Sequence, residues 1–336
     1  MTTSAIPATP TSGHLWRGLF LVCLAGVVWG TIGPAAQVVH DASGLSALTI
    51  GAYRAIAAVV VLVAAAAMMG RLRACLSLGR RHWRRVSAVG VLTAAFQLLF
   101  FVAVLWAGVS VATVVSLGFA PVLLLVIGSA RRRSRPSAGQ VLTAAVALFG
   151  LLLISVAGGT AEEAPHPTLG VLAALASGAA YALSAEAAAP LTQRLDTLTI
   201  TTVTMSVTAA ALVPGGLLVA YVRGEPLMTG DTGSWLLIVY LGTVTMALAY
   251  ALLYAGLRTT PSGAAVVATL LEPVTAVVIA VVFLGERLAP AGLAGALLIM
   301  AAIATLGRRS GQASSRPTRP RRTRPRGACG SPAGRR

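Results

Sequence analysis

Three ionisable side chains, Arg54, Glu186 and Glu272, lie inside long apolar runs of the sequence. A charge at the centre of a bilayer costs about 2.5–3.5 kcal/mol on insertion scales, so each must face a bundle interior or a wet cavity, or carry a partner. Glu272 is the closest of the three to the middle of its run. We expect it to hold a proton or a cationic group, or else to be a structural carboxylate paired with Arg54 or with neighbouring hydroxyls.

Glu186 and Arg54 are open to the same two interpretations. Glu186 lies nearer the end of its run, where a long side chain reaches the headgroups more easily, so a structural role competes with one in coupling. Arg54 is expected either to pair with a carboxylate or to add a positive charge to a cavity. A carboxylate held away from water near the midplane can take up a proton at one face and release it at the other. Glu272, and after it Glu186, is therefore the expected proton carrier if protons are moved.

Prolines inside the apolar runs predict bends in the helices. Pro273 directly follows Glu272, and its missing N–H is expected to leave the carbonyl of Thr269 without its helical partner. Pro34 and Pro121 lie in two other runs. We expect kinks at all three prolines, and the kink beside Glu272 would place a carboxylate next to irregular backbone.

Polar groups on otherwise apolar side chains mark a candidate binding site. Trp29, Gln97, Tyr181, Tyr250 and Tyr254 bring such groups into the apolar runs. Small-ligand sites are mostly apolar with a few placed polar groups, a description that aromatic rings with one polar tip fit. These five residues are therefore the predicted solute-binding residues, although ordinary packing explains any one of them alone.

The composition argues against several kinds of catalytic site. All 26 basic residues are arginine, so both the lysine of a P-loop and the Schiff-base lysine of pyridoxal phosphate enzymes are missing. The three cysteines lack a CxxC spacing, and the four histidines lie at or beyond the edges of the apolar runs. We expect no catalytic residues, no metal site, no cofactor and no ATP hydrolysis by this chain.

The elements that carry these residues are predicted to be membrane-spanning helices. The sequence is 57% apolar and 10% charged, against about 45–50% and about 25% in soluble domains. Runs of about 20 apolar residues are long enough to cross a bilayer. The expected spans are 16–39, 46–69, 86–105, 110–129, 138–157, 169–190, 198–222, 234–255, 262–284 and 288–306. The fold class is thus an all-α polytopic bundle of ten helices.

Arginine positions predict the orientation of the spans, because positive residues in short loops stay in the cytoplasm. With the N-terminus inside, 23 arginines fall on the cytoplasmic side and two outside, while Arg54 lies within a span. Both tails, 1–14 and 308–336, are then cytoplasmic, and the protein belongs in the cell membrane. The second tail is rich in Arg, Pro, Gly and Ser, so it is expected to be disordered near anionic lipid headgroups. The net charge of +17 needs no nucleic-acid partner.

The sequence repeats itself at an offset of 152 residues. The matched pairs include Gly18 with Gly170, Gly26 with Gly178, Trp29 with Tyr181, Ser110 with Ser262, and Pro121 with Pro273. This places one repeat at 15–157, a second at 169–307 and an external linker at 158–168. Because five spans is an odd number, the second repeat is expected to be inverted relative to the first. Secondary transporters are built this way, with the substrate site near the midplane, although a duplication can also be merely structural.

Several motifs resemble the EamA-type transporters of the drug/metabolite transporter superfamily. The matching stretches are Trp29-Gly30, Tyr53-Arg54, Gly118-Phe119-Ala120-Pro121, Pro261-Ser262-Gly263-Ala264-Ala265, Leu271-Glu272-Pro273-Val274 and Phe283-Leu284-Gly285-Glu286-Arg287-Leu288. The resemblance covers about residues 15–307 and implies ten helices, a central cavity and export of small metabolites or drugs. The first repeat departs from the second, because Ala120 and Ser134 replace Glu272 and Glu286.

The leading hypothesis is therefore a secondary transporter that exports amino acids, their derivatives or drugs, with protons as a possible second partner. If protons do not drive it, it is a facilitator that follows the solute's own gradient. A membrane-embedded lipid-modifying enzyme and a non-transporting subunit of a membrane complex are the alternatives. An enzyme of that kind usually shows an acidic metal motif or a catalytic histidine or serine constellation, and we find none in the sequence.

Overall fold

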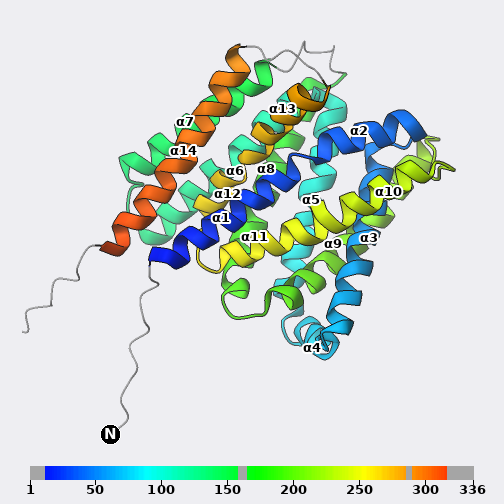
Figure 1. The fold of residues 1–336 in the computed structure, drawn as a ribbon, viewed down its shortest axis with the longest axis horizontal. Coiled ribbons are helices and arrows are strands. Elements are labelled where there is room, and N and C mark those ends of the chain that lie inside the picture. The colour runs from blue at the N-terminus through cyan, green and yellow to red at the C-terminus, as the bar shows by residue number, and fades with distance from the viewer. Residues whose placement is uncertain (1–11, 158–164, 285–289, 316–336) are drawn as a thin grey trace, which may run out of the picture.

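The computed structural model describes residues 12–157, 165–284 and 290–315, and all its regular elements there are helices (Figure 1). In chain order they are α1 (Ser12–Trp29), α2 (Ile32–Ser43), α3 (Ala47–Met68), α4 (Leu72–Arg81), α5 (Trp83–Ala107), α6 (Val109–Arg132), α7 (Ala138–Ala157), α8 (Pro167–Thr192), α9 (Thr197–Val222), α10 (Thr232–Tyr240), the π-helix η1 (Leu241–Leu248), α11 (Ala249–Leu257), α12 (Ser262–Ala268), α13 (Leu271–Leu284) and α14 (Pro290–Ser315). The prediction of an all-α chain is confirmed over the described residues.

Most of these helices belong to helical segments that are long enough to cross a bilayer. Within the described residues, nine helical segments have the length and apolar composition of a membrane span. A shorter apolar helix, Pro290–Leu306, stands where the tenth span was expected. The chain is a multi-pass membrane protein.

Two of the expected spans are broken rather than continuous. The first divides into α1 and α2 around Gly30 and Thr31, and the ninth divides into α12 and α13 around Thr269 and Leu270. The two breaks lie against each other, because a Cβ on Gly30 would come 2.6 Å from the carbonyl oxygen of Glu272. Only glycine permits so close an approach of two backbones.

The three prolines do not all occupy the same kind of position. Pro34 and Pro273 lie in the first turns of α2 and α13, each directly after a break, whereas Pro121 lies inside the uninterrupted helix α6. The expectation of an unpaired carbonyl at Thr269 is wrong, because this oxygen accepts a hydrogen bond from the backbone N–H of Glu272 (2.9 Å). The turn between α12 and α13 supplies the donor that an unbroken helix would have lost at Pro273.

The eighth span changes its helical pitch in the middle. Residues 232–257 run as α10, then η1, then α11 without interruption. In η1 the chain lies very close to α3, since a Cβ on Gly242 would come 2.6 Å from the carbonyl oxygen of Arg54. Wide π-type turns inside α-helices often occur at functional sites. Here the wide turn packs beside the helix that carries Arg54.

Two further features depart from the expected spans. A short helix, α4, occupies most of the loop between the second and third spans. Helix α14 continues to Ser315, so residues 308–315 are helical although we expected a disordered tail there. No proline follows until Pro317, so nothing in the backbone stops the helix at residue 307. The rest of the tail, residues 316–336, lies outside the described residues.

Contacts between helices recur at the offset of the sequence repeat. In each pair, a Cβ added to a glycine of α1 or α8 would come within 3.3 Å of the other residue. The pairs are Gly18 with Thr259, Gly170 with Ala107, Gly26 with Thr269, and Gly178 with Ser116. The repeat offset of 152 relates these pairs. Gly18 corresponds to Gly170 and Thr259 to Ala107. Gly26 corresponds to Gly178, and Thr269 corresponds to within one residue of Ser116. Helix α1 thus packs on the second repeat as α8 packs on the first.

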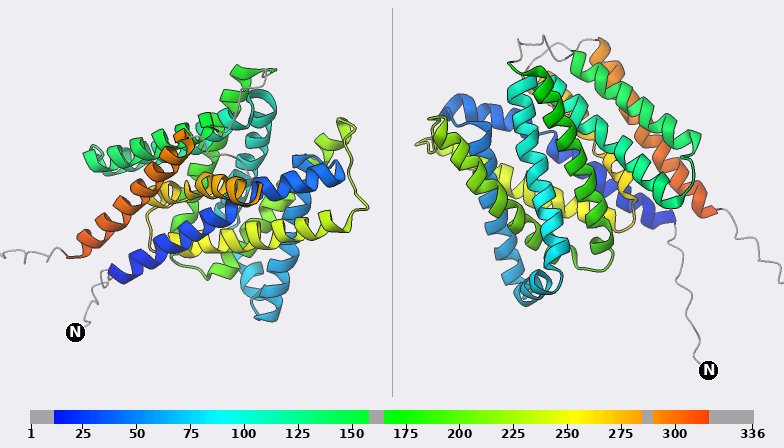
Figure 2. Two further views of the ribbon diagram at one scale, coloured as in Figure 1. Left: turned by 45° about the horizontal axis from the view of Figure 1, so that its top comes forward. Right: turned by 180° about the vertical axis from the view of Figure 1, so that it is seen from behind.

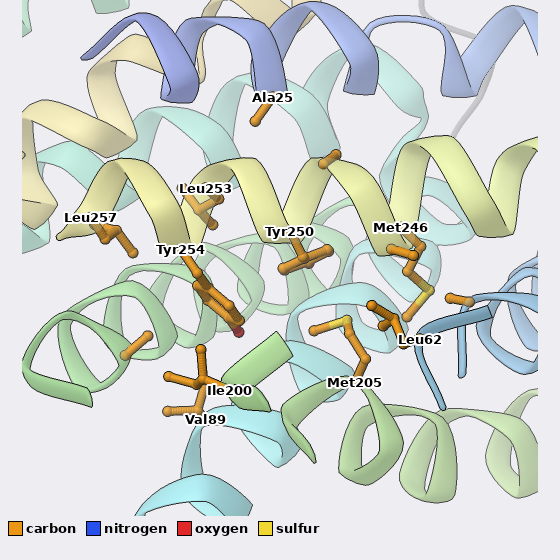
Figure 3. Close-up of a cluster of buried hydrophobic side chains, with 14 of the residues drawn as sticks. Ala25, Leu62, Val89, Ile200, Met205, Met246, Tyr250, Leu253, Tyr254 and Leu257 are labelled. Atoms are coloured by element: carbon orange, nitrogen blue, oxygen red, sulfur yellow. The ribbon is translucent and has the colours of Figure 1, made fainter. Parts of the chain in front are cut away.

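The bundle has one large core and one helix pair at its side. Helices α7 and α14 lie next to each other there, as the three views in Figures 1 and 2 agree. In the large core, Met205, Met246 and Leu62 converge from α9, η1 and α3 (Figure 3). Tyr250 and Tyr254 project from α11 into the same cluster.

Candidate functional site

A cavity of about 140 Å³ lies among helices of both repeats. Its wall is apolar and aromatic, with one positive and one negative side chain. The lining residues are Trp29, Ile32, Arg54, Phe96, Gln97, Phe100, Phe101, Thr113, Leu117, Tyr181, Thr245, Met246, Tyr250 and Glu272. The two halves of the chain therefore build this site together.

The positive side of the cavity is a buried arginine with a free donor. Arg54 is 9% exposed, and its Nη2 donates a 2.5 Å hydrogen bond to Oε1 of Gln97, which is 5% exposed. The Nε of Arg54 has no hydrogen-bond partner among the described residues. A buried guanidinium with an unused N–H is suited to an anionic ligand group, because leaving such a donor unpaired is costly.

The negative side of the cavity is Glu272, in the first turn of α13. The residue is partly buried, and among the described residues its carboxylate forms neither a hydrogen bond nor an ion pair. It interacts electrostatically with Arg54, but the two side chains do not form a salt bridge. Among the described contacts, the carboxylate of Glu272 therefore pairs neither with Arg54 in a salt bridge nor with a neighbouring hydroxyl.

The aromatic wall is held in a fixed arrangement by hydrogen bonds. The indole Nε1 of Trp29 donates to the carbonyl of Thr245 in η1 (2.9 Å), and its ring meets Tyr250 edge-on at 5.2 Å between centroids. In the other half, the hydroxyls of Tyr181 and Thr269 are hydrogen-bonded at 2.8 Å. Trp29 and Tyr181, which the repeat relates, therefore both line the cavity, one from each repeat.

Two of the predicted site residues do not line the cavity. Tyr254 is 2% exposed and packs in the large hydrophobic core, with its ring 6.1 Å from that of Tyr250 (Figure 3). Glu186 forms an ion pair with Arg131 at the end of α6 and accepts a hydrogen bond from the hydroxyl of Ser262. This cluster joins α6, α8 and α12 and matches the structural interpretation of Glu186.

The aromatic part of the wall was largely missed in the sequence. Phe96, Phe100 and Phe101 on α5 all line the cavity, and the ring of Phe96 lies 4.9 Å from that of Tyr181. The sequence does contain a signal for these three residues. They flank Gln97 at helical spacing, and together they are three of the seven phenylalanines within a stretch of six residues. We selected side chains with polar tips, and phenylalanine has none.

Comparison with known proteins identifies the family. The family description "EamA-like transporter family" matches twice, at residues 16–156 and 168–308. The chain belongs to the EamA-like transporter family. As an EamA-like protein it is a membrane transporter, and transport of this kind implies a small-molecule solute. The motif Gly285-Glu286-Arg287-Leu288, part of the resemblance, lies outside the described residues.

Individual relatives agree with the family. The chain is 27% identical over 288 residues to the uncharacterized transporter YwfM of Bacillus subtilis, covering 83% of this chain and 90% of YwfM. It is 28% identical over 300 residues to a probable terminal-alkyne amino-acid exporter of Streptantibioticus cattleyicolor, covering 88% of this chain and 95% of that protein. A solved crystal structure matches with a TM-score of 0.71 at 21% identity, covering 87% of this chain and 98% of the other, which shows a common fold.

Proposed function

We propose that this EamA-like transporter exports small organic solutes, above all amino acids and their derivatives, through the cavity between its repeats. The observation that carries the proposal is the pair of opposite charges, Arg54 and Glu272, which line one aromatic cavity without forming a salt bridge with each other. An α-amino acid presents a carboxylate and an ammonium group together. In this proposal the guanidinium of Arg54 binds the first and the carboxylate of Glu272 binds the second.

The size of the cavity favours amino acids over large drugs. Drug-sized ligands usually occupy about 300–1,000 Å³, whereas an apolar protein cavity of about 150 Å³ holds benzene. The 140 Å³ cavity is in the second range. The name of the Streptantibioticus cattleyicolor relative, a probable exporter of an amino acid, supports the same class. Export of amphiphilic drugs would require the cavity to widen.

The proposed topology has ten spans in two inverted halves, with both termini in the cytoplasm. The arginine distribution supports this orientation, as does Figure 1, in which the start of α1, the end of α14 and α4 all lie toward the lower side. The end of α2 and the start of α8 lie on the opposite side. The recurring contacts at the repeat offset support a pseudo-twofold relation between the halves.

We further propose Glu272 as the group that couples export to protons. Its carboxylate faces the cavity and is unpaired among the described residues, so a proton and the ammonium group of a solute would compete for it. Glu186 is the weaker candidate, since it is already paired with Arg131. If the protein ignores a pH gradient, it is a facilitator.

Reconstitution into liposomes tests the function. Vesicles with the purified protein should exchange a radiolabelled amino acid saturably, while protein-free vesicles should not, and no lipid should be modified. Arg54→Gln removes a charged hydrogen bond worth about 1.5–3 kcal/mol, which corresponds to roughly 10- to 150-fold weaker apparent affinity. Lipid turnover without solute flux would instead support a membrane-embedded enzyme, and neither activity would support a non-transporting subunit.

A further inference from the structure

Helix α4 lies at the boundary between the lipid tails and the headgroups. It follows α3, which ends at Met68, and precedes α5, which begins at Trp83, and both of these helices have the length and composition of spans. A helix between the ends of two adjacent spans must lie near the headgroups on one side of the bilayer. Met68 is 88% and Trp83 is 58% exposed. Both would contact lipid at this level, and tryptophan favours it.

One face of α4 is fixed against the protein. Cys75 and Leu78 are buried, and Leu78 belongs to the large core. A Cβ on Gly79 would touch the side chain of Val203 on α9 at 3.9 Å. Residues 75, 78 and 79 share a face because a helix advances about 100° per residue. The helix is thus anchored on α9, and its opposite face is presented to the surroundings.

The outward face of α4 carries an apolar strip beside a basic strip. Leu72 and Leu76, one turn apart, are 41% and 65% exposed. Arg73, Ser77 and Arg80 follow on the adjacent strip at the same helical spacing. With Arg81, the residues Arg73, Leu76, Ser77 and Arg80 line a surface hollow. Basic groups and exposed leucines on one surface are typical of helices that lie in a membrane interface.

The positive charge of this face is not neutralised by the protein. Among the described residues, Arg73, Arg80 and Arg81 form no ion pair, and the sequence has no acidic residue between 42 and 161. Asp196 is an acidic residue close to Cys75 of α4, and its carboxylate already accepts hydrogen bonds from the backbone N–H and the hydroxyl of Thr199. The arginines are therefore available to an external anion.

We propose that α4 is a binding site for an anionic phospholipid, with Arg73, Arg80 and Arg81 on the headgroup phosphate and Leu72 and Leu76 on the acyl chains. Arginine pairs with phosphate through two parallel hydrogen bonds, and Ser77 adds a hydroxyl donor. A free phosphate would use the arginines alone, whereas a lipid also needs the leucines. The occupant is therefore a lipid of the same membrane leaflet. A bound lipid would brace the ends of α3 and α5, which carry Arg54 and Gln97.

The test measures lipid binding by the full-length protein with native mass spectrometry. The purified protein in detergent is titrated with phosphatidylglycerol and, separately, with zwitterionic phosphatidylcholine. We expect the triple variant Arg73→Gln, Arg80→Gln, Arg81→Gln to bind phosphatidylglycerol at least about tenfold more weakly, with no change for phosphatidylcholine. The control variant Arg132→Gln, Arg133→Gln, Arg135→Gln removes the same charge from another loop and should bind like the parent. The arginines replaced in the triple variant and in the control are all exposed, so both variants should fold like the parent.

A second variant separates a lipid from a free phosphate. Leu72→Ser with Leu76→Ser keeps every arginine, and it should weaken the binding of phosphatidylglycerol while leaving that of inorganic phosphate unchanged. The proposal is overturned if the triple variant keeps the parent's affinity for phosphatidylglycerol, or if the control loses as much as the triple variant. It is also overturned if the leucine variant binds phosphatidylglycerol like the parent. None of these outcomes depends on whether the protein exports amino acids.

Discussion

Gly178 on α8 should not tolerate even one added methyl group. A Cβ at this position would come 2.3 Å from the carbonyl oxygen of Ser116 on α6. The neighbouring atom belongs to the backbone, so no side chain can move aside. Nearby, the hydroxyl of Ser116 donates to that of Ser177, which in turn donates to the carbonyl of Phe96. Pushing α8 away from α6 would strain these bonds and displace Tyr181, one turn further along α8.

Two effects of Gly178→Ala oppose each other. Overpacking costs about 1–3 kcal/mol, and a Cβ at 2.3 Å from a backbone oxygen belongs at the upper end of that range. Alanine gains up to about 1 kcal/mol over glycine in a helix, which leaves a net destabilisation of about 2–3 kcal/mol. Gly128 in α6 is the matched control, because a Cβ there meets nothing within 4 Å. Gly128→Ala should therefore be neutral or stabilising, by up to about 1 kcal/mol.

Thermal unfolding of the purified protein in detergent gives the comparison. Gly178→Ala should melt below the parent protein, and Gly128→Ala at or above it, in the same detergent and at the same scan rate. Amino-acid exchange should also fall in Gly178→Ala, because Tyr181 lines the cavity. A Gly178→Ala protein that melts with or above the parent would refute the close packing of α8 on α6.

Three more predictions concern topology, the cavity and coupling. Reporter fusions should place the 158–168 loop outside the cell and the 71–85 loop inside; both on one face would contradict ten spans. In a background without native cysteines, Trp29→Cys and Tyr181→Cys should react with a small permeant thiol reagent and be protected by a transported amino acid, and inert positions would contradict the cavity assignment. Glu272→Gln should keep solute exchange at saturating solute, with a weaker apparent affinity, and lose transport driven by a pH gradient; undiminished pumping would make Glu272 structural.

The sequence predicted the helical bundle well because membrane spans have a simple physical signature. The expected spans at 46–69, 86–105, 110–129 and 138–157 correspond to α3, α5, α6 and α7, with ends that differ by a few residues. Every backbone polar group must be paired inside lipid, so a long apolar run has little choice but to be helical. The internal repeat then related α1 to α8 without any structural information.

The breaks between α1 and α2 and between α12 and α13 could not be predicted from hydropathy. The breaks at Gly30 and at Thr269 occur in runs that stay apolar, so hydropathy does not change there. At the breaks Gly30 lies close to the backbone of Glu272, and these two segments are distant in the chain. Pro273 was recognised as a bend, but its effect was assigned to a lost hydrogen bond. In the structure the carbonyl of Thr269 instead accepts a hydrogen bond from the backbone N–H of Glu272 in the turn between α12 and α13.

The candidate site was predicted in part. Arg54, Glu272 and Trp29 could be selected because a charge or a polar ring is conspicuous inside an apolar run. Glu186 was conspicuous for the same reason, but its ion pair with Arg131 depends on how α6 and α8 meet. Whether a polar side chain faces a cavity or a partner is decided by packing between helices, and one sequence does not contain that information.

Competition by the two halves of an amino acid tests the central claim most directly. Proteoliposomes would exchange radiolabelled leucine against unlabelled leucine, isoamylamine, which lacks the carboxylate, or 4-methylpentanoate, which lacks the ammonium group. If Arg54 and Glu272 hold the two charged groups together, leucine should compete at least about tenfold better than either analogue, since each charged hydrogen bond contributes about 1.5–3 kcal/mol. Arg54→Gln should remove the advantage over isoamylamine alone. Equal competition by leucine and both analogues would contradict the assignment of the cavity to zwitterionic solutes.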